Sequence, residues 1–266
     1  MPETALRNIL ITGASSGIGA ALAREYAAQG VFLALAGRDR DRLAEIGEAC
    51  RDRGAEVELA VLDVTEAGRL QRWIDSIDAD QPLDLVIANA GISAGSGQSG
   101  MAETADQARR IFDVNLAGVL NTVFPVLPRM IGRGRGQVAV MSSLAAFRGI
   151  ASAPAYCASK AAIRVWGEGL RGALRPHGVR VSVICPGFVE SRMTAANSFP
   201  MPFLMPAERA ARLIRRRLAR NRSRITFPWP MAALVWLMAS LPAGLADVLV
   251  HRGARKPPAT DIQSAD

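Results

Sequence analysis

Short apolar runs alternate with helical patterns along the first two thirds of the chain, and this alternation constrains the fold more than any other feature. The runs that read as buried strands are residues 8–12, 31–36, 57–62, 83–88, 137–142 and 179–184. Helical patterns occupy residues 17–29, 39–52, 67–77, 105–131 and 154–174, and Pro125 and Pro128 should kink or shorten the fourth. Such alternation is typical of a parallel sheet covered on both faces. We therefore expect an α/β fold with a single Rossmann-type, doubly wound parallel sheet and helices on both faces.

The first expected strand runs into a glycine-rich turn, ILITGASSGIGAALA, which places Gly13, Gly17 and Gly19 before the first helix. Glycines let a backbone turn tightly and approach a pyrophosphate, which then binds free N–H groups at the helix N-terminus. A phosphate-loop NTPase would need Gly-Lys-Ser/Thr here, and the first lysine of the chain is Lys160. The turn indicates a dinucleotide site, and an ordinary strand–helix turn stays open as the alternative.

The end of the second expected strand indicates which dinucleotide binds. An acidic residue there selects NAD, whereas an arginine accommodates the 2′-phosphate of NADP. The sequence places Gly37 and Arg38 at this point, and Asp39 is better placed to cap the next helix. We favour NADP(H), with a solvated loop charge as the alternative reading of Arg38.

Tyr156 and Lys160 form the strongest chemical signal. The chain holds 32 Lys and Arg residues, of which only two are lysines, and only two residues are tyrosines. At a separation of four on a helix, the two side chains share one face. An ammonium beside a phenol favours the phenolate, lowers the tyrosine pKa, and makes the tyrosine an acid/base near neutral pH.

With these residues, the chain resembles the short-chain dehydrogenase/reductase family over about residues 6–195. The motifs that carry the resemblance are Thr12-Gly13-Ala14-Ser15-Ser16-Gly17-Ile18-Gly19, Asp63-Val64, Asn89-Ala90-Gly91, Asn115, Ser143, Tyr156 with Lys160, and Pro186-Gly187. They stand in the family's order and at its usual separations. Two departures are small: Ala88 replaces a frequent asparagine, and Ser191 stands where threonine is more common.

The resemblance implies a role for each position. Tyr156 would be the acid/base, Lys160 would lower its pKa and hold the nicotinamide ribose, and Asn115 would support a water-linked proton path to Lys160. Ser143, with Ser142 as the weaker candidate, would hydrogen-bond the substrate oxygen. The cofactor would bind Gly13, Ser15, Ser16, Gly17, Ile18, Gly19, Arg38, Asp63, Val64, Asn89, Ala90, Gly91, Tyr156, Lys160, Pro186, Gly187, Val189 and Ser191. The family also implies a homodimer or homotetramer.

Composition excludes several other classes. Cys50, Cys157 and Cys185 are odd in number and lack metal spacing, and the two histidines lie far apart, so we expect no metal site. Reduced cysteines and an N-terminus without a signal-peptide pattern favour a cytoplasmic protein. The net charge of +8 could indicate nucleic acid or an anionic membrane, but no nucleic-acid-binding signature accompanies it.

The last third of the chain carries the least specific signals. Residues 188–206 read as a substrate lid rich in Phe and Met, which favours a hydrophobic carbonyl or alcohol. Residues 207–224 carry eight arginines, with Ala210, Leu213, Ile214 and Leu218 as one apolar face. Residues 231–241 are apolar but too short to cross a bilayer. We therefore expect an oxidoreductase domain over residues 1–228, an apolar helical extension over 229–252, and a disordered tail over 253–266. The extension could contact a membrane interface, cover the substrate pocket or form a subunit contact.

These observations predict an NADP(H)-dependent oxidoreductase that interconverts a carbonyl and an alcohol by hydride transfer. A catalytically silent NADP-binding scaffold or sensor is the alternative, although the intact Ser143, Tyr156 and Lys160 argue against it. A basic nucleic-acid-binding protein is the weaker alternative.

Overall fold

Seven parallel strands form one sheet in the order β3-β2-β1-β4-β5-β6-β7, which confirms the predicted doubly wound α/β fold. The structure is a computed structural model that describes residues 6–93, 103–197 and 199–242. The strands are β1 Asn8–Thr12, β2 Phe32–Gly37, β3 Glu56–Val61, β4 Leu85–Ala88, β5 Gly136–Met141, β6 Val179–Pro186 and β7 Arg224–Phe227. The seventh strand was not predicted, because its four residues lie between an arginine-rich helix and two prolines.

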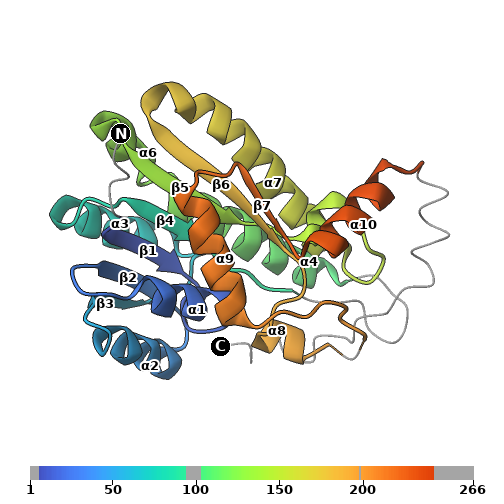
Figure 1. Ribbon diagram of the computed structural model, residues 1–266, viewed down its shortest axis with the longest axis horizontal. Coiled ribbons are helices and arrows are strands. Elements are labelled where there is room, and N and C mark those ends of the chain that lie inside the picture. The colour runs from blue at the N-terminus through green and yellow to red at the C-terminus, as the bar shows by residue number, and fades with distance from the viewer. Residues whose placement is uncertain (1–5, 94–102, 198, 243–266) are drawn as a thin grey trace.

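Helices cover both faces of this sheet (Figure 1). They are α1 Gly17–Tyr26, α2 Arg40–Arg51, α3 Ala67–Asp80, α4 Ala105–Phe112, α5 Gly118–Val123, α6 Leu127–Arg133, α7 Pro154–Leu174, α8 Arg192–Ala195, α9 Ala207–Ala219 and α10 Trp229–Ser240. The short turns η2 Leu144–Phe147 and η3 Arg175–His177 are 3₁₀ helices.

Alternation along the strands divides the core into two layers. Ile9 and Ile11 face the layer that contains α1, α2 and α9, whereas Leu10 faces the layer that contains α3, α5 and α7. Successive strand residues point to opposite faces, so a strand that is apolar at every position buries both sides. Cys50 and Cys185 lie within these layers, and all three cysteines are buried thiols that form no disulfide.

The expected helix over residues 105–131 is divided into α4, the π-helical segment η1 Asp113–Ala117, α5 and α6. Pro128 lies in the first turn of α6, where a proline needs no N–H partner. By length and composition, the run Ala105–Arg133 would be long enough to cross a bilayer, but half of its most apolar window is buried inside the protein. We read it as a core element.

The C-terminal third differs in part from expectation. Ala210, Ile214 and Leu218 of α9 are fully buried against the sheet and α1, so the apolar face of this basic helix is not free to enter a membrane. Within the predicted lid, Val189 forms a parallel bridge with Met205, which ties the two ends of the segment together. The predicted disordered tail, residues 253–266, lies outside the described residues.

Candidate active site

The predicted site residues lie at the carboxyl edge of the sheet. Gly13 follows β1, Arg38 follows β2, Asn89 follows β4, Ser142 follows β5 and Gly187 follows β6. From β1 the strand order continues to β2 and β3 on one side of the sheet, and from β4 it continues to β5, β6 and β7 on the other side. A crevice forms at the switch point between β1 and β4. Ligands of open α/β sheets bind in such a crevice.

The turn between β1 and α1 has the geometry of a phosphate cradle. Gly13 and Gly17 adopt left-handed backbone angles, with φ of 67° and 53°. A Cβ atom at Gly17 would lie 2.9 Å from the Cβ of Ser191, and one at Gly19 would collide with the Gly13 carbonyl oxygen. Ser16, the N-cap of α1, makes no side-chain capping bond, and the first turn holds no acidic residue. The first N–H groups of α1 are therefore suited to an anion, which fits a dinucleotide pyrophosphate.

Ser15 and Ile18, in the same turn, contact different parts of the protein. Ser15 lies beside the end of β2, because a Cβ at Gly37 would come within 3.1 Å of its hydroxyl oxygen. Ile18 is half-buried and packs against the core layer of α1. Ser15 thus lies against the end of β2, whereas Ile18 packs the first turn of α1 on the core.

Asn89, Ala90 and Gly91 connect β4 to the same crevice. The Asn89 amide donates to the carbonyl oxygens of Thr12 (3.0 Å) and Gly13 (3.1 Å), and its backbone N–H donates to the Thr12 hydroxyl. The Ala90 N–H also donates to the Thr12 hydroxyl, at 3.3 Å. Asn89 thereby holds the glycine turn against β4.

Arg38 lies with Asp63 and Arg110 at the end of β2 and β3. The Asp63 carboxylate accepts hydrogen bonds from Thr65 and from Arg110 (2.7 Å), and Arg38 Nη1 lies 3.8 Å from it. Burial alone would raise the pKa of Asp63, but the hydrogen bonds from Thr65 and Arg110 outweigh it and lower that pKa. Asp63 is thus an ionised carboxylate that holds two arginines.

Val64, next to Asp63, is buried against α5. A Cβ atom at Gly118 would collide with its side chain, so the contact between this residue and the helix is close. Val64 therefore packs in the core layer of α5, and its carbonyl oxygen accepts from the Asn121 amide at 2.9 Å.

Ser143, Tyr156 and Lys160 are brought together across η2 and α7. A hydrogen bond joins the side chains of Ser143 and Tyr156, and Lys160 Nζ lies 5.8 Å from the centre of the Tyr156 ring. Lys160 is 3% exposed, and its ammonium donates to the Met141 carbonyl oxygen at 3.0 Å. Ser142 is different: its hydroxyl donates to the Lys160 carbonyl oxygen at 2.7 Å, so it holds the helix rather than Tyr156.

The titration of this cluster differs from the sequence-based expectation. Burial raises the pKa of Tyr156, and the Ser143 hydrogen bond opposes this only in part. Burial also lowers the pKa of Lys160 to about 8. The expected lowering of the Tyr156 pKa by Lys160 is therefore not what this arrangement produces, because desolvation disfavours both charged forms.

Asn115 lies in the π-helical segment and is fully buried. Its side chain accepts from the Ile92 N–H (2.8 Å) and donates to the Ile92 carbonyl oxygen (2.9 Å) and to the Ser159 hydroxyl (3.0 Å). Ser159 in turn donates to the Tyr156 carbonyl oxygen at 2.8 Å. Sequence reasoning missed Ser159, although its place one residue before Lys160 on the Tyr156 helix could have indicated it.

Gly91 has little room for a side chain in this region. A Cβ atom there would lie 3.0 Å from Lys160 Nζ and 3.1 Å from Asn115 Oδ1. The backbone after β4 therefore passes directly beside the lysine and the asparagine, and a side chain at this position would require one of them to shift by a few tenths of an ångström.

The segment after β6 closes the opposite side of the crevice. The Ser143 hydroxyl approaches the Pro186 carbonyl oxygen at 3.5 Å, and the Gly187 N–H donates to the Phe227 carbonyl oxygen at 2.7 Å. Val189 is buried in its bridge to Met205. Ser191 caps α8 through a reciprocal pair of bonds with Thr194 and lies against Gly17.

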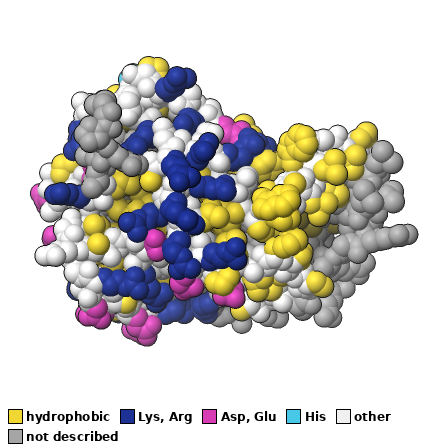
Figure 2. Space-filling view, viewed as in Figure 1, with side chains coloured by type: hydrophobic (Ala, Val, Ile, Leu, Met, Phe, Trp, Pro, Cys, Tyr) yellow, Lys and Arg dark blue, Asp and Glu magenta, His cyan; other side chains and the backbone are white. Residues whose placement is uncertain are grey.

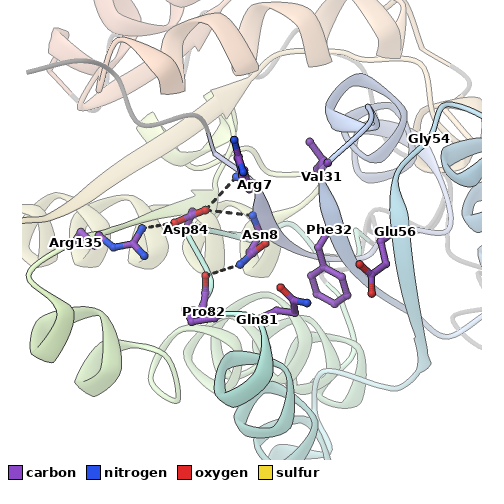
Figure 3. Close-up of a pocket in the computed structure, with 11 residues that line it drawn as sticks. Arg7, Asn8, Val31, Phe32, Gly54, Glu56, Gln81, Pro82, Asp84 and Arg135 are labelled. Atoms are coloured by element: carbon purple, nitrogen blue, oxygen red, sulfur yellow. Dashed lines mark hydrogen bonds and ion pairs between the residues drawn. The ribbon is translucent and has the colours of Figure 1, made fainter.

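A cavity of about 780 Å³ opens at the other edge of the sheet, far from these residues (Figure 3). There the Asp84 carboxylate accepts from the backbone N–H groups of Arg7 (3.0 Å) and Asn8 (3.2 Å) and from the Arg135 guanidinium (2.7 Å). These bonds join the starts of β1, β4 and β5, so Asp84 has a structural role. In residues 6–93, 103–197 and 199–242, no cluster of three His, Cys, Asp or Glu side chains could hold a metal ion.

Parallel strands that place a tyrosine and a lysine beside a phosphate cradle define a class of nicotinamide-dependent oxidoreductases. The comparison with known families identifies the family within this class. The family model described as short chain dehydrogenase matches residues 7–200, and the chain belongs to the short-chain dehydrogenase/reductase family.

Individual relatives agree with this assignment. An uncharacterized oxidoreductase of Myxococcus xanthus is 41% identical over 253 residues, covering 95% of this chain and 99% of the relative. A short chain dehydrogenase/reductase from Burkholderia phymatum in complex with NAD superposes with a TM-score of 0.81 at 27% identity, covering 97% of this chain and 99% of the other. A short-chain dehydrogenase from Sphingobium yanoikuyae in complex with NADPH gives 0.77 at 26% identity, covering 90% and 97%.

Proposed function

We propose that this protein interconverts a carbonyl and an alcohol by hydride transfer with NADP(H). The observation that carries the proposal is the convergence of Ser143, Tyr156 and Lys160 beside the glycine cradle at one edge of the sheet. When bound, the nicotinamide supplies or accepts the hydride. The protein holds the reactants in place and moves the proton.

In the reduction direction, the Tyr156 hydroxyl donates its proton to the substrate oxygen while the carbonyl carbon gains a hydride. Its raised pKa keeps Tyr156 protonated at neutral pH, so it is ready as an acid. Ser143, already hydrogen-bonded to Tyr156, orients the same oxygen. In the oxidation direction Tyr156 must accept the alcohol proton, and its raised pKa makes this direction favour alkaline pH.

Lys160 holds the ribose hydroxyls of the nicotinamide in this proposal. Its pKa of about 8 leaves it charged at neutral pH, and its bond to the Met141 carbonyl fixes the ammonium in the crevice. Asn115 lies next to Gly91, which is beside Lys160. We assign Asn115 the support of a water-linked proton path to Lys160.

The preference for NADP(H) rests on Arg38, which follows β2 at the adenosine end of the crevice. Its side chain is 27% exposed and its guanidinium lies 3.8 Å from Asp63, at the long end of the ion-pair range, so we expect its remaining N–H donors to engage a 2′-phosphate. The two solved relatives named above carry different cofactors, NADPH and NAD. Calorimetric titration with NADPH and NADH measures the cofactor preference. Tighter binding of NADH would contradict the proposed preference for NADP(H).

A hydrophobic substrate is favoured by the side chains around the predicted lid. The rings of Phe188 and Phe199 lie 5.9 Å apart, and Met231 of α10 lies close to Gly187. Aromatic and methionine side chains line apolar, adaptable pockets. A panel of carbonyl compounds of increasing chain length tests this, and a preference for small charged ketones would contradict it.

A subunit contact is proposed for the face formed by α5 and α7. Phe124 and Val165 are more than half exposed there, and Phe124 lies 6.0 Å from the Trp166 ring. Exposed apolar patches of this kind mark interfaces. We expect a homodimer or homotetramer, which analytical ultracentrifugation measures.

The decisive test of the proposed reaction is Tyr156→Phe. Loss of the proton donor should reduce carbonyl turnover by about 10²–10⁴-fold, whereas NADPH affinity should stay within about twofold, because the ring remains. Ser142→Ala is the matched control, since its hydroxyl bonds the Lys160 carbonyl and not Tyr156. Full turnover by Tyr156→Phe would rule out Tyr156 as the acid/base. NADPH binding without turnover of any carbonyl by the original chain would instead favour a cofactor-binding scaffold.

A further inference from the structure

Helix α10 has an apolar surface on both its inner and its outer side. Its twelve residues include no charged side chain. Met231, Ala232 and Val235 pack on the protein core. On the opposite side Trp229 is 77% exposed, Leu234 58%, Trp236 64% and Leu237 56%. A helix that is apolar all round is normally buried on every side, so the outer face of α10 needs a covering partner.

This helix begins at the candidate active site. A Cβ atom at Gly187 would lie 2.8 Å from Met231 Sδ and 3.4 Å from Leu144 in the turn that follows Ser143. Gly187 is itself hydrogen-bonded to Phe227, two residues before α10. The inner face of α10 therefore forms part of the wall near the predicted nicotinamide position, and its outer face continues to the surface.

The predicted lid extends the same apolar surface. Met193 is 38% exposed, Phe203 57% and Leu204 40%. Figure 2 shows hydrophobic side chains gathered over α10 and the neighbouring lid segment, on the side of the molecule away from α2 and α3. The entrance of the site is thus bordered by apolar side chains.

Helix α9 adds positive charge on the same face. Its inner residues Ala210, Ile214 and Leu218 are buried, which directs Arg209, Arg212, Arg216 and Arg220 to the surface. Within the described part of the chain, no carboxylate pairs with these four arginines. Figure 2 shows a column of basic side chains over α9 directly beside the hydrophobic area of α10.

We propose that α9 and α10 dock this protein on an anionic lipid bilayer, with α10 lying in the interface and the substrate entering from the lipid. Three observations favour lipid over a second copy of the chain. Two tryptophans, Trp229 and Trp236, lie on the exposed apolar stripe, and helices in the membrane interface carry tryptophan on their apolar face. Unpaired arginines flank the stripe, which suits anionic headgroups but would repel an identical partner. The apolar rim continues into the predicted substrate entrance.

The length of α10 agrees with this orientation. Twelve residues span about 18 Å at 1.5 Å per residue, less than the roughly 30 Å of a hydrocarbon core. The helix can therefore lie in the interface but not cross it. The inference rests on the proposed function for the entry of substrate, whereas the docking itself does not depend on catalysis.

Sedimentation with lipid vesicles tests the docking. The full-length protein is mixed with vesicles of phosphatidylcholine alone or of phosphatidylcholine with phosphatidylglycerol. We expect binding only to the anionic vesicles, weakened by salt because surface charge is screened. The double variants Leu234→Glu/Leu237→Glu and Arg212→Glu/Arg216→Glu should each lower the partition coefficient about tenfold or more. Leu234→Met/Leu237→Met and Arg69→Glu/Arg109→Glu are the matched controls and should bind like the original chain.

Two further measurements keep the outcome decisive. NADPH binding by each variant shows that it is folded, and ultracentrifugation without lipid shows whether α10 joins two copies. The proposal would be overturned by absence of vesicle binding or by equal binding to neutral vesicles. It would also be overturned if Leu234→Glu/Leu237→Glu converted an oligomer to a smaller species while the original chain did not bind vesicles. Tyr156→Phe must bind vesicles like the original chain. Vesicle binding without carbonyl reduction would therefore refute the reaction and leave the docking standing.

Discussion

The ammonium of Lys160 is buried and donates a hydrogen bond to the carbonyl oxygen of Met141, the last residue of β5, at 3.0 Å. A charged group is thus held inside the core by one neutral acceptor. Burial lowers its pKa from 10.5 to about 8, which means that the charged form is less stable in the folded protein than in the unfolded chain.

The first prediction concerns the stability cost of this lysine. Below about pH 8 both states carry the charge, and the folded state bears the full penalty. Between about 8 and 10.5 the unfolded chain binds more protons, so stability rises with pH. Lys160→Met should therefore raise the free energy of unfolding at pH 7 by about 1–3 kcal/mol while impairing catalysis, and the gain should shrink toward pH 10. Urea unfolding at several pH values measures this, with Arg69→Met as an exposed control; a gain that does not depend on pH would contradict it.

A second prediction concerns Asn115, which bonds both backbone groups of Ile92 and the Ser159 hydroxyl. Asn115→Leu leaves the N–H and carbonyl groups of the half-buried Ile92 without these partners and should cost about 2–4 kcal/mol of unfolding free energy. It should also reduce turnover more than NADPH affinity. The half-buried Asn121, which makes one bond to the Val64 carbonyl, is the matched control and should cost about 1 kcal/mol as Asn121→Ala. Similar losses for both variants would argue against a special role for Asn115.

The third prediction separates stability from function at the opposite edge of the sheet. The buried Asp78 accepts two bonds from Arg133 (2.7 and 3.0 Å) and one from the Leu83 N–H. Asp78→Asn should destabilise the fold by about 2–4 kcal/mol, because it removes the charge that balances Arg133. Asp75→Asn, on the exposed ion pair with Arg129, should cost at most about 1 kcal/mol. Neither should alter the KM for substrate at a permissive temperature, and a changed KM would mean that this edge communicates with the site.

The fourth prediction concerns the selection of the cofactor. Arg38→Asp should weaken NADPH binding by about 10–100-fold, the value of one charge-assisted hydrogen bond, and leave NADH binding similar or stronger. Because the new acid would also face Asp63, Arg38→Gln is needed as a variant without added charge. Arg110→Gln is the positional control, since Arg110 bonds the same carboxylate. An unchanged ratio of NADPH to NADH affinity in both Arg38 variants would remove Arg38 as the selector.

Much of the fold could be predicted because its signals are local. Buried parallel strands are apolar at every position, and the helix between two such strands must cover the sheet, so the order of elements follows from the sequence. Asp39 illustrates this at one residue: it was expected to cap the second helix, and its carboxylate accepts from the Arg42 N–H at 2.9 Å. The edge strand β7 escaped prediction because its four residues become a strand only by pairing with β6.

The candidate site likewise has one part that local sequence patterns predict and another that depends on how the chain folds. The residue types at the strand ends could be predicted, because the glycine turn, Ser143 and the Tyr156–Lys160 spacing are local patterns whose chemistry depends on the side chains alone. The environment of these side chains depends on the tertiary structure. It buried Lys160 and half-buried Tyr156, and the loss of hydration moved both pKa values against the charged forms. It also turned the apolar face of α9 inward while leaving that of α10 exposed. Desolvation and exposure depend on residues distant in the chain, and no local pattern specifies them.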